Sequence, residues 1–306
     1  MEKITVTPEI AGQRLDKYLH DQHGEYSRAW IQKLINDQRV LVNGKIAKPH
    51  LALRTNDTVE CDLVDRPTIS LDPEPDIKFQ VITETSDYAV IVKPAGLVVH
   101  PAEGVTEHTL VNGLLHRWPG IAKVGDDPVR PGIVHRLDKE VSGLMLITLN
   151  QAAFEYYKSQ FQARNISKHY LALVYDPVLP DEGAITFSIV RTKDGRMSSR
   201  PNSSGEGRPA RTEYDVLERF NHTALVGVKT LTGRTHQIRV HFHGMGHPLV
   251  GDPLYRIGRF SRLATTDQLM LLADRLAFTD REGNAQAYKI DPPAWWQETL
   301  RNLRDS

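Results

Sequence analysis

The chain has 306 residues, enough for one large domain and one small one. Its 40% hydrophobic and 25% charged residues are typical of a globular protein, and no apolar run approaches the roughly 18 residues that a membrane helix needs. The formal net charge of zero excludes a uniformly basic nucleic-acid binder, and the single cysteine, Cys61, excludes an internal disulfide. Because the start shows no signal-peptide pattern, we expect a cytoplasmic protein without membrane contacts.

Residues 1–65 predict a small module of helices and short strands. Apolar residues recur with helical spacing at 12–19 and 28–36, and residues 40–45 predict a strand that ends in an Asn-Gly turn. This order, with the segments RLDKYL and VLVNGK, resembles the RNA-binding domain first described in ribosomal protein S-four. The resemblance implies a basic face for structured RNA, formed by four side chains: Arg28, Lys33, Arg39 and Lys45.

Two observations weaken this interpretation of the small module. On charge alone, a solvated face is the default explanation for a few clustered cations. In addition, Gln38 stands where the family usually has a glycine, the residue best suited to the left-handed turn that ends many helices. This departure puts the local turn in question, although the order of elements still favours the RNA-binding domain.

Residues 66–78 contain three prolines and no helical periodicity, so we expect a linker there. Residues 79–306 predict one large domain. Its expected helices lie at 108–118, after Asn150 and at 292–300, and its expected strands at 88–92, 144–147, 168–175, 184–190, 212–219, 223–229 and 237–243. Successive strands joined by short turns predict a mixed, largely antiparallel sheet, so the fold class is α+β.

The segment 131–149, PGIVHRLDKEVSGLMLITL, places a carboxylate in a loop that leads into a buried strand. Asp138 follows Arg136 by two residues, and Pro-Gly and Ser-Gly turn formers flank the loop. A carboxylate with a basic neighbour, on a loop held by rigid elements, is a common catalytic arrangement. Taken alone, the same spacing is more often a surface ion pair.

HRLD followed by KEVSGL resembles the signature of the RluA/RluD-type family of RNA pseudouridine synthases. Two further blocks resemble the same family in the same order: VKPAGLVVHP at 92–101, and TGRTHQIRVH at 232–241 followed by GHPLVGD at 246–252. The resemblance implies that 79–306 is a catalytic domain that isomerises uridine in structured RNA. Large-subunit ribosomal RNA is the preferred target and transfer RNA the alternative, and we expect a monomer.

Pseudouridine formation breaks the bond between a uracil nitrogen and the anomeric carbon of the ribose. The base then turns and is rejoined through carbon five, without redox change, so we expect no cofactor. As in glycoside cleavage, a carboxylate can meet the charge that develops at the anomeric carbon. The sequence leaves open whether this carboxylate attacks the sugar, attacks the base or removes a ribose proton.

The resemblance makes Asp138 the catalytic residue and Tyr170 the active-site tyrosine, which can stack on a flipped-out uracil. A desolvated aspartate stays ionised only beside a cation. We expect that cation to be Arg234, because Arg239 lies further along the predicted strand. The remaining expected contacts of the substrate near this site are His135, Arg136, which the resemblance implicates in displacing the target base, and Arg239.

Two other functions remain open. A non-catalytic RNA-binding or ribosome assembly factor could use the same fold. A metal-dependent hydrolase could use Asp138 with a histidine cluster to hold zinc or manganese and activate water. The histidines of that cluster would be His236, His241, His243 and His247. We expect no metal site, because the resemblance supplies a complete metal-free account of the same residues.

Overall fold

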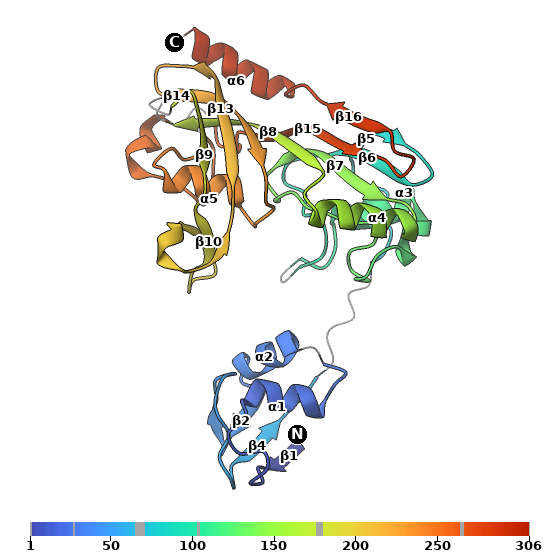
Figure 1. Ribbon diagram of the computed structural model, residues 1–306, viewed down its shortest axis with the longest axis vertical. Coiled ribbons are helices and arrows are strands. Elements are labelled where there is room, and N and C mark those ends of the chain that lie inside the picture. The colour runs from blue at the N-terminus through green and yellow to red at the C-terminus, as the bar shows by residue number, and fades with distance from the viewer. Residues whose placement is uncertain are drawn as a thin grey trace. The chain divides into compact units, whose positions relative to one another are not determined.

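The computed structural model of the chain describes residues 2–26, 28–64, 71–102, 105–175, 180–263 and 266–305. The chain divides into two compact units, Met1–Ile69 and Ser70–Ser306 (Figure 1). Within the described ranges, no helix is long and apolar enough to cross a membrane.

The N-terminal unit packs two helices on a four-stranded antiparallel sheet with the order β1-β4-β2-β3. Apolar side chains from both helices and from the sheet form one core, which includes the buried Cys61. The two predicted helices and the predicted strand are therefore confirmed. The elements are β1 (Glu2–Thr5), α1 (Leu15–Gln22), α2 (Arg28–Asn36), β2 (Val40–Val42), β3 (Lys45–Ile46) and β4 (Thr58–Cys61).

Two turns in this unit use left-handed backbone. Asn43 and Gly44, between β2 and β3, have φ of 54° and 70°, the signs expected at the centre of a tight hairpin turn. Gln38, just after α2, has φ of 62°. The glutamine therefore adopts the conformation that a glycine would favour, at a cost on the order of 1 kcal/mol, and the turn is retained.

A buried carboxylate joins the two helices of the N-terminal unit. Asp16 on α1 is 0% exposed and accepts hydrogen bonds from Arg14, Arg28 and Gln32. Burial alone would raise the pKa of Asp16, but the hydrogen bonds from these three side chains outweigh it and lower the pKa to about 2. Because Arg28 and Gln32 belong to α2, this carboxylate fixes one helix against the other.

We expect Asp16→Asn to destabilise the N-terminal unit by about 3 kcal/mol at pH 7, because two arginines lose their charged partner. The folded-state pKa of Asp16 lies below the unfolded value of about 3.9, so its ionisation stabilises the fold above pH 4. In the wild type that contribution, on the order of 2 kcal/mol, is lost as the pH falls from 4 towards 2. Urea titrations, followed by hydrogen exchange in peptides from α1 and α2, measure the destabilisation by Asp16→Asn and the loss of wild-type stability at low pH.

The matched control for this prediction is Asp62→Asn. Asp62 forms an exposed ion pair with Arg39 at 2.7 Å, so its loss should cost less than about 1 kcal/mol. Equal stability of Asp16→Asn and the wild type at pH 7 would contradict the anchoring role.

The large unit is built on a nine-stranded sheet with the order β5-β6-β7-β15-β8-β14-β13-β9, in which β16 also pairs with β15 (Figure 1). A separate small sheet has the order β11-β10-β12. The strands are β5 (Gln80–Glu84), β6 (Tyr88–Lys93), β7 (Ser142–Thr148), β8 (Ser167–Tyr175), β9 (Glu182–Ile185), β10 (Ser188–Arg191), β11 (Met197–Arg200), β12 (Arg208–Pro209), β13 (Thr212–Arg219), β14 (Thr223–Thr230), β15 (Leu271–Thr279) and β16 (Ala285–Lys289). The α-helices are α3 (Leu110–Arg117), α4 (Gln151–Gln162), α5 (Gln237–Gly244) and α6 (Ala294–Arg304), with 3-10 helices at Pro119–Lys123, Asn202–Ser204 and Gly258–Leu263.

Alternating side chains of the sheet build a core on each face. On β7, Met145 and Ile147 pack in one cluster with apolar residues of α3 and α5. Leu144 and Leu146 point the other way and pack with residues of α4. Further along the sheet, residues of α6 cover Leu173 of β8. The sheet is therefore the middle of three layers, with helices on both faces.

Only β7 and β15 pair in parallel within the described sheet, so it is mixed and largely antiparallel, as predicted. Gly143 makes this pairing possible. Its φ is 132°, and a Cβ there would lie 2.4 Å from the carbonyl oxygen of Ala273 on β15. The close approach of the two strands fixes the end of the loop that carries Asp138.

Three sequence predictions for the large unit need correction. The predicted strand at 237–243 is helix α5, and the predicted strand at 184–190 is two strands, β9 and β10. Of the predicted linker, residues 66–70 lie outside the described residues. Residues 71–78 pack on the large unit: the Glu74 carboxylate bonds to His108 just before α3. That part is therefore no free linker.

Helix α5 escaped prediction because its pattern is misleading. Its residues 237–242 are all buried, the polar Gln237, Arg239 and His241 included, so no solvent-exposed polar face marks a period of 3.6. The alternating Ile238, Val240 and Phe242 then imitate a strand. His236, at the N-cap, has φ of 54°, a left-handed conformation that turns the chain into the helix.

Candidate active site

A hollow of about 410 Å³ lies between the 134–141 loop, helix α4, strand β8 and the segment 230–239. Asp138 and Tyr170 both line it. Asp138 is the only carboxylate among the described residues of the lining, and its side chain is 16% exposed. The structure thus brings the two residues predicted to be central into one cavity that is open to solvent.

Lys93, the last residue of β6, holds the loop that carries Asp138. Its side chain is fully buried, and its Nζ donates to the carbonyl oxygens of Pro94, Leu97 and Lys139 at 2.8, 2.9 and 3.1 Å. Burial lowers the pKa of Lys93 to about 7, and the charge of Asp138 opposes the shift. Three carbonyl acceptors match the three donors of an ammonium group, so Lys93 ties the loop to the turn after β6.

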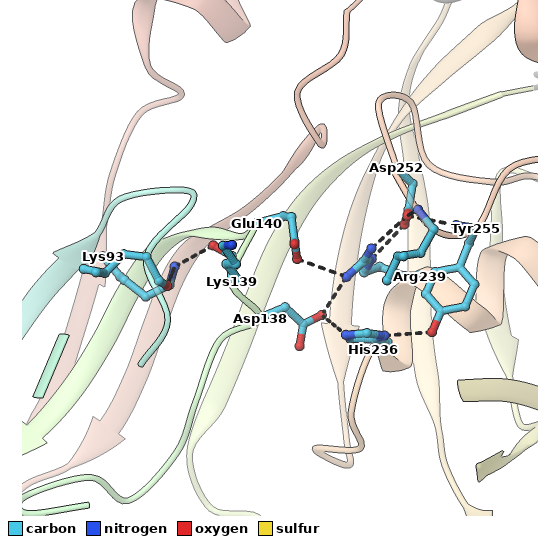
Figure 2. A network of polar contacts seen from close by, with 10 residues as sticks. Lys93, Asp138, Lys139, Glu140, His236, Arg239, Asp252 and Tyr255 are labelled. Carbon is cyan, nitrogen blue, oxygen red and sulfur yellow. Dashed lines mark hydrogen bonds and ion pairs between the residues drawn. The ribbon is translucent and has the colours of Figure 1, made fainter. Parts of the chain in front are cut away.

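Arg239, on α5, is the cation that faces Asp138. Its Nη1 lies 3.5 Å from Oδ2 of Asp138 and 3.5 Å from Oε2 of Glu140 (Figure 2). Its Nε and Nη2 bind both carboxylate oxygens of Asp252 at 2.7 and 2.8 Å. Burial would lower the pKa of Arg239, but the bonds and charge of Asp252 raise it above its ordinary value. A fully buried, permanently charged guanidinium is thus aimed at Asp138.

The structure contradicts the expectation that Arg234 pairs with Asp138. Arg234 lines the hollow, but its Nε donates to the carbonyl oxygen of Pro209 at 3.4 Å, and the ion pair belongs to Arg239. The error follows from the strand prediction at 237–243. On a helix, residues three apart share a side, so His236 at the N-cap and Arg239 both reach Asp138.

His236 completes a ring of polar contacts around the carboxylate. Its Nε2 lies 4.0 Å from Oδ2 of Asp138, and its Nδ1 is 2.7 Å from the hydroxyl of Tyr255 (Figure 2). The backbone N–H of Tyr255 donates to Asp252, and Asp252 also accepts a hydrogen bond from Arg239. Burial lowers the pKa of His236, which favours the neutral imidazole at pH 7. Oδ1 of Asp138, in contrast, makes no hydrogen bond within the described residues.

Sequence reasoning missed three members of this arrangement as site residues, Lys93, Asp252 and Tyr255, and considered His236 only as a metal ligand. Lys93 and Asp252 stand inside the blocks VKPAG and GHPLVGD, and His236 inside GRTHQIR. The available signal was therefore a charged or polar residue in each block that resembles the family. Tyr255 follows the last block by three residues and carried no signal of its own.

Tyr170 stands on β8 with its ring at the hollow and against the main core cluster. Burial raises the pKa of Tyr170 above its ordinary value, and the negative charge of Asp138 adds to the shift. The phenol therefore stays protonated at neutral pH. Lys168, two residues before Tyr170 on the same strand, also lines the hollow, because alternate residues of a strand share a face.

His135 and Arg136 precede Asp138 but differ in their surroundings. Nε2 of His135 accepts a hydrogen bond from the backbone N–H of Leu146 at 2.9 Å, and the ring stacks on Phe161 at 4.7 Å. Burial lowers the pKa of His135 to about 3, so the ring is neutral. Arg136 is exposed and lines the hollow. His135 thus supports the wall, while Arg136 is free to meet a ligand.

The histidines of the alternative metal site do not converge on one point. His241 and His247 contact backbone carbonyl oxygens, and His236 contacts Tyr255. Across the described ranges, one group has three potential ligand atoms within 4.8 Å of one another, and it lies in the N-terminal unit: Glu2, His23 and Cys61. The donor set needed for the hydrolase is therefore not assembled around Asp138.

The four cations predicted to bind RNA in the N-terminal unit are half-buried or exposed, but most have carboxylate partners. Arg28 bonds to the buried Asp16, which gives it a structural role. Lys33 and Arg39 form exposed ion pairs at 3.5 and 2.7 Å, of the kind that contributes at most about 1 kcal/mol. Lys45 is exposed on β3. An RNA phosphate could replace the weakly bound carboxylate partners of Lys33 and Arg39. RNA contact by the four cations stays a prediction.

Comparison with known proteins assigns both units to families. The family model for RNA pseudouridylate synthase matches residues 87–244, and the model for the S4 domain matches residues 13–59. The chain belongs to the RNA pseudouridylate synthase family. It is thus an isomerase that converts uridine to pseudouridine in RNA, and it carries an S4 RNA-binding domain at its N-terminal end.

Relatives of similar length support this assignment. An uncharacterized RNA pseudouridine synthase of Aquifex aeolicus is 43% identical over 95% of this chain and 92% of its own. The ribosomal large subunit pseudouridine synthase D of Escherichia coli K12 is 39% identical over 82% of this chain and 75% of its own. The solved structure of human RNA pseudouridylate synthase domain containing 1 has a TM-score of 0.59 at 23% identity, over 79% and 98% of the two chains, and so shares the fold.

Proposed function

We propose that this protein isomerises uridine in large-subunit ribosomal RNA, with Asp138 as the catalytic carboxylate. The observation that carries the proposal is the position of Asp138, which is the one carboxylate of the described lining and faces the buried charge of Arg239 at 3.5 Å. A relative that is 39% identical is named for the ribosomal large subunit, which favours that RNA as the target.

In this mechanism the buried positive charge of Arg239 faces Asp138 at 3.5 Å, in a site from which the substrate excludes water. Oδ2 of Asp138 faces Arg239 and His236, so Oδ1 is the oxygen available to the nucleotide. The same oxygen could attack the sugar, attack the base or remove a ribose proton. In each case a developing positive charge, or a departing uracil, lies beside a fixed carboxylate.

The base must leave its stack to reach this oxygen. Tyr170 lines the hollow beside Asp138 and offers a ring on which a flipped uracil can stack, which contributes about 1–3 kcal/mol per base. Arg136, exposed at the rim, is placed to take the position that the flipped base leaves. The neutral imidazole of His236 is the group available to accept the proton that leaves carbon five, whereas the protonated phenol of Tyr170 can only donate one.

The test uses unmodified large-subunit ribosomal RNA transcribed with uridine tritiated at carbon five. Because rejoining the base through carbon five expels the hydrogen there, the protein should release tritium without an added nucleotide or cofactor. Transfer RNA labelled in the same way is the comparison. Release from transfer RNA alone would overturn the ribosomal target, and a folded protein that releases tritium from neither RNA would overturn the proposed function.

A further inference from the structure

A second hollow, of about 360 Å³, adjoins the one that holds Asp138. It lies between the end of α4, the start of β8, and the end of β14 with the segment that follows. The two hollows share wall residues, among them Phe161, Lys168, Thr230 and Arg234. A chain that enters the first hollow can therefore continue into the second.

Four cations line the second hollow, and no carboxylate does among its described wall residues. None of the four makes an ion pair within the described parts of the chain. Glu213, directly opposite Lys229 on the neighbouring strand, bonds to Arg211 at 2.8 Å instead. The four side chains are Arg164, Lys168, Lys229 and Arg234.

Lys168 shows most clearly that this wall lacks a negative charge. It lines both hollows, and its Nζ lies 5.6 Å from the centre of the Phe161 ring. Burial lowers the pKa of Lys168, and no carboxylate of the described residues opposes the shift. An ammonium group that is desolvated without a counter-ion is unfavourable, so an anion in the hollow would relieve the cost.

We infer that the second hollow binds the backbone phosphates of the nucleotides next to the target uridine. This inference rests on the proposed function, because it takes the nucleotide beside Asp138 as its starting point. An RNA strand whose uridine enters the first hollow must carry its phosphates past the shared wall, where Lys168 and Arg234 stand. Arg164 and Lys229, exposed at the outer side, then meet the next phosphates along the strand.

The test neutralises the two outer cations, Arg164→Gln and Lys229→Gln. Each should raise KM for the tritiated ribosomal transcript about 3- to 10-fold and leave kcat unchanged. Each should also reduce the slope of log Kd against log salt by about one, measured as direct RNA binding. Lys229→Arg, which keeps the charge, should recover most of the affinity.

Matched controls are Lys289→Gln on β16 and Arg301→Gln on α6, exposed cations that line neither hollow. If the wild type is active but the two test variants show the same KM and salt slope as the controls, the phosphate site is overturned. A loss confined to kcat would also overturn it, because phosphate contacts act on binding. An inactive wild type that binds RNA with the expected salt slopes would instead reject the proposed function alone.

Discussion

Asp138→Asn should abolish tritium release, with a fall of about 10⁴-fold or more in kcat, the range seen when a reacting carboxylate or nucleophile is removed. Asparagine keeps the size and shape of the side chain but offers neither a nucleophilic oxygen nor a base. The affinity for RNA should change less than about threefold, because the cationic walls of the hollow are untouched. Single-turnover release and equilibrium binding on the same transcript measure the two effects separately.

The control for this prediction is Asp181→Asn. Asp181 is 91% exposed in an ion pair with Arg219, away from the residues that line the hollow. It should release tritium at the wild-type rate. An Asp138→Asn variant that keeps more than a few per cent of activity would show that another group performs the reaction. If cells that carry Asp138→Asn show the same pseudouridines in their RNA as cells with the wild type, a non-catalytic binding factor is favoured.

Arg239→Gln should have the second largest effect, about 10²- to 10³-fold in kcat, the usual cost of losing one preorganised electrostatic contact. The glutamine presents no positive charge to Asp138 and cannot neutralise Asp252. Because Asp252 is 1% exposed, its unpaired charge should also lower the free energy of unfolding by about 3–5 kcal/mol. Urea titration gives the stability, and rates normalised to folded protein give the catalytic loss.

Arg234→Gln is the matched variant that separates the two arginines. Both line the hollow, but Arg234 contacts a backbone carbonyl, whereas Arg239 contacts Asp138. We expect Arg234→Gln to act mainly through KM and to leave the unfolding free energy within about 1 kcal/mol of the wild type. A larger kcat loss in Arg234→Gln than in Arg239→Gln would contradict the ion pair described above.

Local patterns in the sequence were sufficient for most of the fold. Periodicity predicted α2 and β13, because their buried faces follow the period of the element. Strand β7, which is buried on both faces, was predicted from its short apolar run instead. Asn150 was a sound N-cap signal, since its side chain accepts from the N–H of Ala153. The prediction of α5 failed because its polar residues are buried with the apolar ones, so no solvent-exposed face shows the helical period.

The candidate site was predicted only in part, because the misread helix α5 carries one of its residues. Motif resemblance reached Asp138 and Tyr170, which lie in one hollow. The choice between Arg234 and Arg239 depended on whether residues 237–243 form a strand or a helix. Because we predicted a strand, we chose Arg234 as the partner of Asp138 in place of Arg239. The hydrogen bond between Asp252 and Arg239 forms because the chain after α5 folds back on the helix. No local sequence pattern indicates such a contact.

The most direct test of the central claim is a nucleotide-resolution map of pseudouridines in cells that lack this protein. Complementation with the wild type should restore one or a few missing sites in large-subunit ribosomal RNA. Complementation with Asp138→Asn, at equal protein level, should restore none. Restoration of the same sites by Asp138→Asn would contradict the role of this carboxylate, and loss confined to transfer RNA would contradict the target.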